Sequence, residues 1–176
     1  MPSKGKGARK ESQPGPMLHI GDAGSKGKGV FASRRIELGD LVWDYSGKER
    51  WIKDIPKGLW QYCFQVDYDR YVVPEKGSAG WIMNHTCEPN CVIMGRTRII
   101  ALRPIEEGEE VTFDYSTNVG WDGFSMECKC GTAGCRKVVR SYRYLPDDLK
   151  GHYGACVSAF LLGPQTKRAR AKARKR

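Results

Sequence analysis

The sequence has no long hydrophobic run and no segment that resembles a secretory signal. The longest apolar stretch near its C-terminus covers residues 155–163, whereas a membrane helix needs about 20 apolar residues. Basic residues near the N-terminus have no apolar segment behind them, as a secretory signal would require. The sequence therefore predicts an intracellular protein without a membrane partner.

An excess of acidic side chains is also missing, because the formal net charge is +10. This positive charge lies at the two ends of the chain. The first and last ten residues carry 11 of the 30 Lys and Arg side chains, which leaves 19 against 20 Asp and Glu in between. Basic ends of this kind often bind polyanions, but they can also be solvated tails without a partner. The near-neutral body is not predicted to be a nucleic-acid-binding domain itself.

The glycine-rich stretch GSKGKGVFA, residues 24–32, lacks the features of both common nucleotide-binding loops. A phosphate-binding loop ends in Gly-Lys-Ser/Thr, but here the last glycine is followed by Val30. The dinucleotide fingerprint needs a strand before the glycines and a helix after them. No strand is predicted before residue 24, and the turn signal at Gly39 leaves no room for the helix. The glycines predict either a flexible turn or a backbone that approaches a ligand closely.

Short runs of β-branched and aromatic residues recur about every ten residues, separated by turn signals. They read VFASR, LVWDY, YCFQV, RYVV, CVIM, TRIIAL and EVTFDY. This spacing predicts one mainly β domain of small sheets, with helical turns only around residues 79–83 and 147–162. Residues 36–42 and 105–111 share the pattern Ile-Glu-x-Gly-acid-x-Val, which predicts two similar turns that lead into strands.

Seven cysteines in a chain without a secretory signal favour metal ligation over disulfides. The segment CKCGTAGC, residues 128–135, can wrap three thiols around one face of a tetrahedral zinc ion. The fourth ligand stays open among Cys63, Cys87, Cys91, Cys156, His85 and His152. The segment NHTCEPNC, residues 84–91, is predicted to lend one thiol to this cluster. A catalytic Cys-His pair is disfavoured there, because the two residues are nearly adjacent and no orienting acid is evident.

Several motifs together resemble the SET-domain protein-lysine methyltransferases. The segments KGKGVFA, GDLVWDYSG, KGSAGWIMNHTCEPNC, EEVTFDYS and CKCGTAGCR occur in the order and spacing of that family, over residues 18–138. The resemblance implies a mainly β, SET-domain (β-clip-like) fold of small curved sheets. It also implies that the NHxCxPN segment and the segment ending in FDY form a pseudoknot around the active site. The cysteines then belong to a short C-terminal zinc-binding segment, called post-SET.

The resemblance assigns roles to individual residues. It implies a site for S-adenosyl-L-methionine at Gly27, Lys28, Gly29, Tyr62, Asn84 and His85. Tyr115 matches the catalytic tyrosine, and Phe113 and Tyr45 are implied to act beside it. A structural Zn²⁺ ion is implied at Cys87, Cys128, Cys130 and Cys135. The other three cysteines, Cys63, Cys91 and Cys156, are predicted to be plain buried thiols.

The sequence departs from the family pattern near the NHxCxPN motif. Residues 81–83, Trp-Ile-Met, stand where the family often has Arg-Phe and then Ile, so no contact of that Arg is carried over. Ser78 stands where Asn is common, and the stretch 71–77 is shorter than usual. No cysteine-rich segment precedes the domain, so only the minimal catalytic unit is expected. The expected organisation is a flexible basic arm (1–17), a SET catalytic domain (18–120), a post-SET zinc segment (121–140), a C-terminal extension (141–163) and a basic tail (164–176).

The function that the resemblance implies is S-adenosylmethionine-dependent methylation of lysine in a histone-like chromatin protein or another nucleic-acid-associated protein. Phe113 favours di- or trimethylation. The alternatives are a catalytically silent SET-fold zinc module tethered to nucleic acid, and a methyltransferase of a ribosomal or other protein. The C-terminal extension either closes over the active site or packs as a structural element. The chain is expected to be a monomer, located in the cytoplasm or nucleoid if the protein is prokaryotic, and in the nucleus on chromatin if it is eukaryotic or viral.

Overall fold

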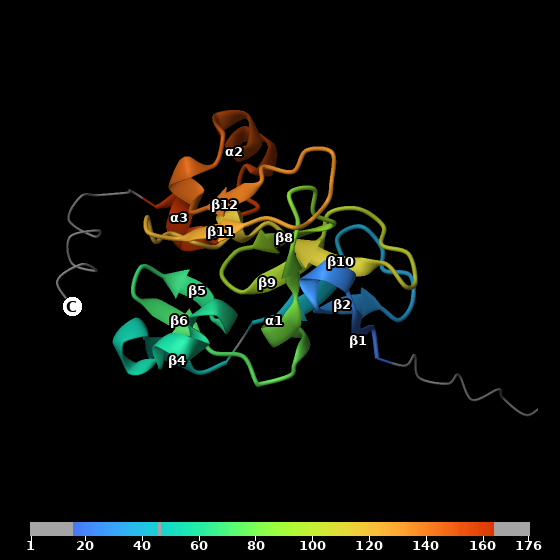
Figure 1. The fold of residues 1–176 in the computed structure, drawn as a ribbon, viewed down its shortest axis with the longest axis horizontal. Helices are drawn as coiled ribbons and strands as arrows, with labels where there is room; N and C mark the ends of the chain where they lie inside the picture. The colour runs from blue at the N-terminus through green and yellow to red at the C-terminus, as the bar shows by residue number, and fades with distance from the viewer. Residues whose placement is uncertain (1–15, 46, 164–176) are drawn as a thin grey trace, which may run out of the picture.

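The computed structural model describes residues 16–45 and 47–163, so most of the predicted basic arm and the whole basic tail lie outside the described residues. Within these residues the chain forms four small sheets and three short α-helices (Figure 1). No helix in the described ranges is long and apolar enough to cross a membrane. The predicted mainly β fold of small sheets is confirmed.

The sheet that carries most of the candidate site has the strand order β1-β2-β10-β7. Its strands are β1 (Leu18–Asp22), β2 (Lys28–Ala32), β10 (Glu110–Phe113) and β7 (Asn84–His85). β10 pairs antiparallel with β2 and parallel with β7, where Phe113 lies opposite His85. The NHTCEPNC segment therefore runs directly beside the strand that leads into FDY, which is the pairing expected for the pseudoknot.

The other strands form three smaller sheets. One contains β3 (Leu41–Asp44), β9 (Arg98–Ala101) and β8 (Cys91–Met94). The second contains β4 (Glu49–Trp51), β6 (Arg70–Val72) and β5 (Phe64–Asp67), and the third pairs β11 (Ser125–Glu127) with β12 (Val138–Arg140). The α-helices are α1 (Ala79–Ile82), α2 (Asp147–Tyr153) and α3 (Ala159–Leu162). Short 3₁₀ segments are η1 (Gly24–Lys26), η2 (Ile52–Asp54), η3 (Lys57–Tyr62), η4 (Tyr115–Thr117) and η5 (Tyr142–Tyr144).

Every strand-like run identified in the sequence overlaps a strand, and both predicted helical stretches contain helix. The prediction that no strand precedes the glycine-rich stretch is wrong, because β1 lies there. β1 has the weakly β-forming sequence LHIGD, and it is a strand because all its residues pair with β2. The dinucleotide fingerprint is still excluded, since a strand rather than a helix follows the glycines.

The two copies of the Ile-Glu-x-Gly pattern meet in space. Ile36 and Ile105 form an antiparallel bridge in which each backbone N–H donates to the other residue's carbonyl at 2.9 Å, and both side chains are fully buried. Gly39 and Gly108 form the predicted turns with φ of 87° and 80°, which glycine adopts without steric cost. The two Ile-Glu-x-Gly turns therefore stabilise each other, although the strands that follow them, β3 and β10, belong to different sheets.

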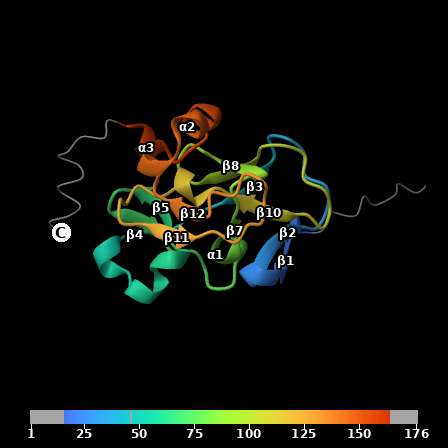
Figure 2. The same ribbon diagram turned by 45° about the horizontal axis from the view of Figure 1, so that its top comes forward.

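The C-terminal extension packs on the body as a structural element. Its helices contribute to a hydrophobic cluster with Val92 of β8, and they lie together on one side of the molecule (Figures 1 and 2). The backbone N–H of Ser158 donates to the carbonyl of Thr117 at 2.9 Å. Of the residues described for this extension, none lines the cavity of the candidate site. The packing alternative is therefore favoured over a cover for the active site.

Candidate active site

A cavity of about 670 Å³ lies at the end of β10, and nearly half of the residues that line it are aromatic. Four of the predicted site residues line it: Tyr45, Tyr62, Phe113 and Tyr115. The other predicted cofactor residues do not line it and form a second group: Gly27, Lys28, Gly29, Asn84 and His85. The two groups adjoin at Met83, which lines the cavity and precedes Asn84 in the chain.

Tyr115 is fixed at both its backbone and its hydroxyl. Its N–H donates to Nδ1 of His85 at 3.1 Å, and its hydroxyl donates to the carbonyl of Met83 at 2.8 Å. Burial raises the pKa of Tyr115, and the negative charge of Glu110 adds to this effect. The phenol is therefore neutral at physiological pH, and its oxygen can still accept a hydrogen bond from a ligand.

Phe113 forms an apolar wall beside Tyr115. Its side chain is 4% exposed, and its ring centroid lies 5.1 Å from that of Tyr115. The Tyr45 ring is 6.5 Å from Phe113 and stacks on Phe64 at 4.1 Å. Burial raises the pKa of Tyr45 well above its ordinary value, so this hydroxyl is neutral as well. Neutral rings around a small space disfavour the charged form of any amine that enters it.

The Gly-x-Gly turn requires glycine for two different reasons. Gly27 has a φ of 80°, in the left-handed region that other residues rarely adopt. A Cβ on Gly29 would lie 2.6 Å from Oε1 of Glu110 and 2.8 Å from Cβ of Ala23. The bare backbone at Gly29 thus faces a carboxylate at a distance that only glycine permits.

Asn84 and Glu110 hold this turn in place. Nδ2 of Asn84 donates to the carbonyl of Lys28 and to Oε1 of Glu110, both at 2.9 Å. Lys26 donates to the other carboxylate oxygen of Glu110. Sequence reasoning did not identify Glu110 as part of the site. No local pattern marks it, because it joins the turn only through the pairing of β10 with β2 and β7.

The His85 side chain is part of the interior and is 5% exposed. Its Nδ1 accepts the N–H of Tyr115, and its Nε2 lies 3.5 Å from Sγ of Cys87. Burial lowers the pKa of His85 to about 4, so the ring is neutral at physiological pH. Both ring nitrogens face protein groups. Only the backbone of His85 is therefore free to contact a cofactor as predicted. Its ring connects Tyr115 to the cysteine cluster.

Tyr62 stacks on Trp81 on another side of the cavity. Their ring centroids are 4.1 Å apart and the planes differ by 12°. Trp81 is one of the residues at which the sequence departs from the family pattern. The indole of Trp81 forms part of the cavity wall at the position where the family often has an arginine.

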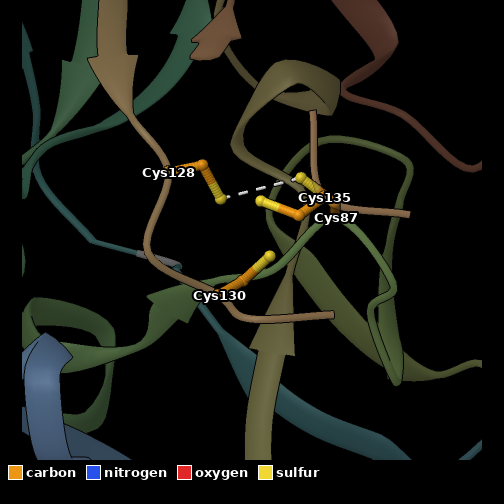
Figure 3. Close-up of side chains that lie close together, drawn as sticks. All are labelled: Cys87, Cys128, Cys130 and Cys135. Carbon is orange, nitrogen blue, oxygen red and sulfur yellow. Dashed lines mark hydrogen bonds between the residues drawn. The ribbon is translucent and has the colours of Figure 1, made fainter. Parts of the chain in front are cut away.

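Four thiols converge on one point, as Figure 3 shows. Tyr115 packs against the hydrophobic cluster that contains Cys87 and Cys128. The Sγ atoms of Cys87, Cys128, Cys130 and Cys135 all lie within 4.8 Å of one another. Sγ of Cys87 and Sγ of Cys128 are 3.7 Å apart. A tetrahedral zinc ion with Zn–S bonds of about 2.3 Å holds its sulfurs roughly 3.8 Å apart. The donor set and its spacing fit a structural Zn²⁺ ion, and Cys87 is the fourth thiol that the sequence left open.

The three remaining cysteines lie outside this cluster. Cys91 is fully buried, as predicted. Cys63 and Cys156 are only half-buried, so the prediction of plain buried thiols is wrong for these two. Cys63 donates to the carbonyl of Leu59 at 3.2 Å and lines the aromatic cavity.

A buried ion pair next to the site was also missed. The Asp114 carboxylate, fully buried, accepts two hydrogen bonds from Arg136, at 2.7 and 2.6 Å. The hydroxyl of Tyr153 donates to the same carboxylate at 3.1 Å. Asp114 belongs to the FDY motif and Arg136 follows the last zinc-site cysteine. Both lay inside motifs that the sequence analysis quoted, but nothing in the sequence indicated that they pair.

The sequence profile described as the SET domain matches residues 27–116, which run from the Gly-x-Gly turn to just past Tyr115. The chain belongs to the SET-domain family. It is 35% identical over 132 residues to the histone-lysine N-methyltransferase trithorax of Drosophila melanogaster, which covers 64% of this chain and 3% of trithorax. It is 33% identical over 140 residues to the histone H3-lysine(4) N-trimethyltransferase ATX1 of Arabidopsis thaliana, which covers 69% of this chain and 13% of ATX1. The chain thus spans only a small part of the length of these relatives.

Solved structures support the same fold. The crystal structure of KRYPTONITE in complex with mCHH DNA, H3(1-15) peptide and SAH matches with a TM-score of 0.51 at 29% identity, over 69% of this chain and 29% of that chain. A second KRYPTONITE structure, with mCHG DNA and SAH, matches with a TM-score of 0.53 at 28% identity, over 69% of this chain and 28% of that chain. The SET-domain fold implied by the sequence motifs is confirmed.

Proposed function

We propose that this chain is the catalytic unit of an S-adenosylmethionine-dependent protein-lysine N-methyltransferase. The observation that carries the proposal is Tyr115, a neutral phenol fixed by Met83 and His85 in an aromatic cavity. Membership of the SET-domain family and the names of its relatives support the same reaction. Tyr115, the Gly-x-Gly turn and Asn84 are all present in this chain, which favours the enzyme over a catalytically silent module.

The second group of residues fits the methyl donor. S-adenosylmethionine supplies a methyl group bound to a positively charged sulfur. The residues that would hold it are the turn at Gly27–Gly29, Asn84, the backbone of His85, and Tyr62 from the cavity side. At Gly27 a Cβ would meet nothing within 4 Å, so the backbone of the turn is open to a ligand there, while Gly29 packs against Glu110 and Ala23. A structural Zn²⁺ ion at the four-thiol cluster completes the proposed site.

The cavity suits the other reactant, a lysine side chain. Free lysine has a pKa of about 10.4 and must lose its proton before it can act as a nucleophile. The rings of Phe113 and Tyr45 favour the neutral amine, because an apolar environment lowers the pKa of lysine. The Tyr115 oxygen can accept an N–H of that amine and so aim the nitrogen lone pair. Alignment and exclusion of water are then the protein's main contributions to the rate.

The residue at position 113 bears on how many methyl groups are added. Phe113 has no hydroxyl, and its ring is packed among Tyr45, Phe64 and Tyr115. A wall without a hydrogen-bonding group does not hold a water molecule firmly beside the amine. A methylated amine then has space to turn its lone pair back toward the donor, so we infer that the product is di- or trimethyl-lysine.

The proposed substrate is a basic protein of chromatin, such as a histone, which places the reaction in the nucleus of a eukaryotic host. The names of the relatives and the H3(1-15) peptide in the KRYPTONITE structure support this choice. A ribosomal protein or another basic protein is the alternative. Contact with nucleic acid through the basic ends and the monomeric state remain predictions, because the ends lie outside the described residues.

The proposal is tested by incubating the protein with isotope-labelled S-adenosylmethionine, core histones and purified ribosomal proteins. Tandem mass spectrometry should find labelled methyl-lysine on a histone. Tyr115→Phe should reduce transfer by about 100-fold or more, while its affinity for S-adenosylhomocysteine stays within several-fold. Label on ribosomal proteins alone would correct the substrate. No label from a folded protein that binds the cofactor would support the silent module instead.

A further inference from the structure

Asp122 is the only charged side chain among the described residues that line the aromatic cavity. It lies in a turn closed by a hydrogen bond from the N–H of Phe124 to the carbonyl of Trp121 at 3.1 Å. The lysine chemistry proposed above gives this carboxylate no role. A charged group in a largely apolar wall costs free energy unless a cation compensates it. We therefore ask which cation Asp122 binds.

The carboxylate of Asp122 has one paired and one unpaired oxygen. Oδ2 accepts a hydrogen bond from Nη1 of Arg143 at 3.0 Å. Oδ1 is buried and has no hydrogen-bond partner within the described part of the chain. The side chain of Asp122 is 20% exposed and that of Arg143 is 54% exposed. The pair is exposed mainly on its arginine side, so Arg143 can turn toward solvent and leave Oδ2 of Asp122 to another cation at low cost.

The reacting lysine is not that second cation. A carboxylate beside an amine stabilises the ammonium form and raises its pKa, whereas methyl transfer needs the neutral amine. Tyr115, which we expect to orient the amine, has the neutral ring of Phe113 as its neighbour. The cation for Asp122 must therefore belong to a different residue of the same substrate.

The surroundings of Asp122 favour the guanidinium of arginine. Trp121, which precedes Asp122 in the chain, is 57% exposed, and Trp60, 38% exposed, lines the same cavity. A guanidinium can stack flat on an indole while its N–H groups bond to a carboxylate. The ammonium of lysine is a compact, strongly hydrated charge and is less suited to this combination.

We propose that Asp122 and Trp121 form a specificity subsite for an arginine that lies close in sequence to the target lysine. The proposal rests on the methyltransferase function and narrows its substrate to a basic segment that contains both residues. Arg143 is the internal partner that the substrate arginine joins or displaces toward solvent. Asp122 and Trp121 thus select the substrate, while Tyr115 acts at the reacting lysine.

The test compares peptides with a single lysine that carry either arginine or citrulline, its neutral isostere, at one neighbouring position. This position is moved up to about four residues to either side, because an extended chain advances about 3.3 Å per residue. Mass spectrometry gives kcat/KM for each peptide. At one position at least, the wild-type protein should prefer arginine by about fivefold or more, which corresponds to an ion pair at the upper end of the exposed range.

Three variants locate the preference. Asp122→Asn should lose this preference, so that its kcat/KM becomes equal on the arginine and citrulline peptides. Arg143→Gln should increase it, because the substrate arginine no longer competes with an internal cation. Asp148→Asn removes an exposed carboxylate outside the cavity and should keep the wild-type preference.

Each contrary result has a distinct meaning. Equal preference in the wild type and Asp122→Asn overturns the subsite but leaves the methyltransferase function standing. A preference that falls in Arg143→Gln to the level of Asp122→Asn also overturns it, because Arg143 would then be needed rather than competing. If a folded, cofactor-binding protein transfers no methyl group to any peptide, the proposed function fails, and the subsite fails with it.

Discussion

Arg136 and Asp114 form a bidentate ion pair that joins the cysteine segment to Tyr115, the proposed catalytic tyrosine. Both carboxylate oxygens of Asp114 accept a guanidinium N–H, at 2.7 and 2.6 Å, and the side chains are 15% and 0% exposed. Arg136 directly follows Cys135, and Asp114 directly precedes Tyr115. Because each partner adjoins a proposed functional residue, the position of Tyr115 depends on how the cysteine segment folds.

Loss of this ion pair should be costly. Arg136→Gln leaves a buried carboxylate without its cation, which typically costs about 3–5 kcal/mol. Arg136→Lys keeps the charge but not the planar fork, so it should lie between this variant and the wild type. Chemical denaturation gives the free energy of unfolding, and methyl transfer should fall in the same order.

Arg35→Gln is the matched control for that prediction. Arg35 also forms ion pairs, with Glu37 and Glu106, but all three side chains are about half exposed or more. Its loss should barely change the stability. Equal free energies of unfolding for Arg136→Gln and Arg35→Gln would show that the buried ion pair stabilises the fold no more than the exposed one.

The four-thiol cluster should bind about one zinc ion per chain. A Cys87→Ser, Cys135→Ser double variant should lose the metal, become less stable in the cysteine segment and lose activity, because metal binding is coupled to folding. Elemental analysis of the purified protein measures the zinc. Cys156→Ser, outside the cluster, should keep it. Full zinc occupancy in the double variant would disprove the assignment.

The cofactor site should be sensitive to a single methyl group at Gly29. In Gly29→Ala the new Cβ would lie 2.8 Å from Cβ of Ala23, which the backbone holds in place. Overpacking of this kind costs about 1–3 kcal/mol of stability, part of which a shift of the turn relieves. A shifted turn should reduce the affinity for S-adenosylhomocysteine in calorimetry by about tenfold or more. Gly58→Ala, where a Cβ would meet nothing within 4 Å, is the control and should bind normally. Unchanged affinity in Gly29→Ala would place the cofactor elsewhere.

Phe113→Tyr should shift the product toward monomethyl-lysine at similar cofactor affinity. The added hydroxyl can hold a water beside the amine, in the space that further methyl groups need. Time-resolved mass spectrometry on a single-lysine peptide follows the three products. Phe160→Tyr adds the same hydroxyl outside the cavity and should leave the products unchanged. A wild-type reaction that stops at one methyl group under excess cofactor would contradict the prediction.

Much of the fold and of the site could be predicted from the sequence. The strand runs with β-branched and aromatic residues became strands, since their composition favours a half-buried pleated surface. Five strands were not predicted, namely β1, β4, β7, β11 and β12. The first and third of them, β1 and β7, show the reason. They are short, and β1 contains Gly21, so their pairing with β2 and β10 decides their conformation. Short-range composition carries no information about such partners.

The residues of the candidate site divide in the same way. The sequence by itself determined the family, the Gly-x-Gly turn and the CxCx4C thiols. Metal ligation and tight turns require particular residue types at close spacing, and spacing can be read from the chain. Only the tertiary structure brought Glu110 to Gly29, paired Asp114 with Arg136, turned the His85 ring inward and placed Asp122 in an aromatic wall. These contacts join residues far apart in the chain, so they depend on strand pairing and packing that no local pattern encodes.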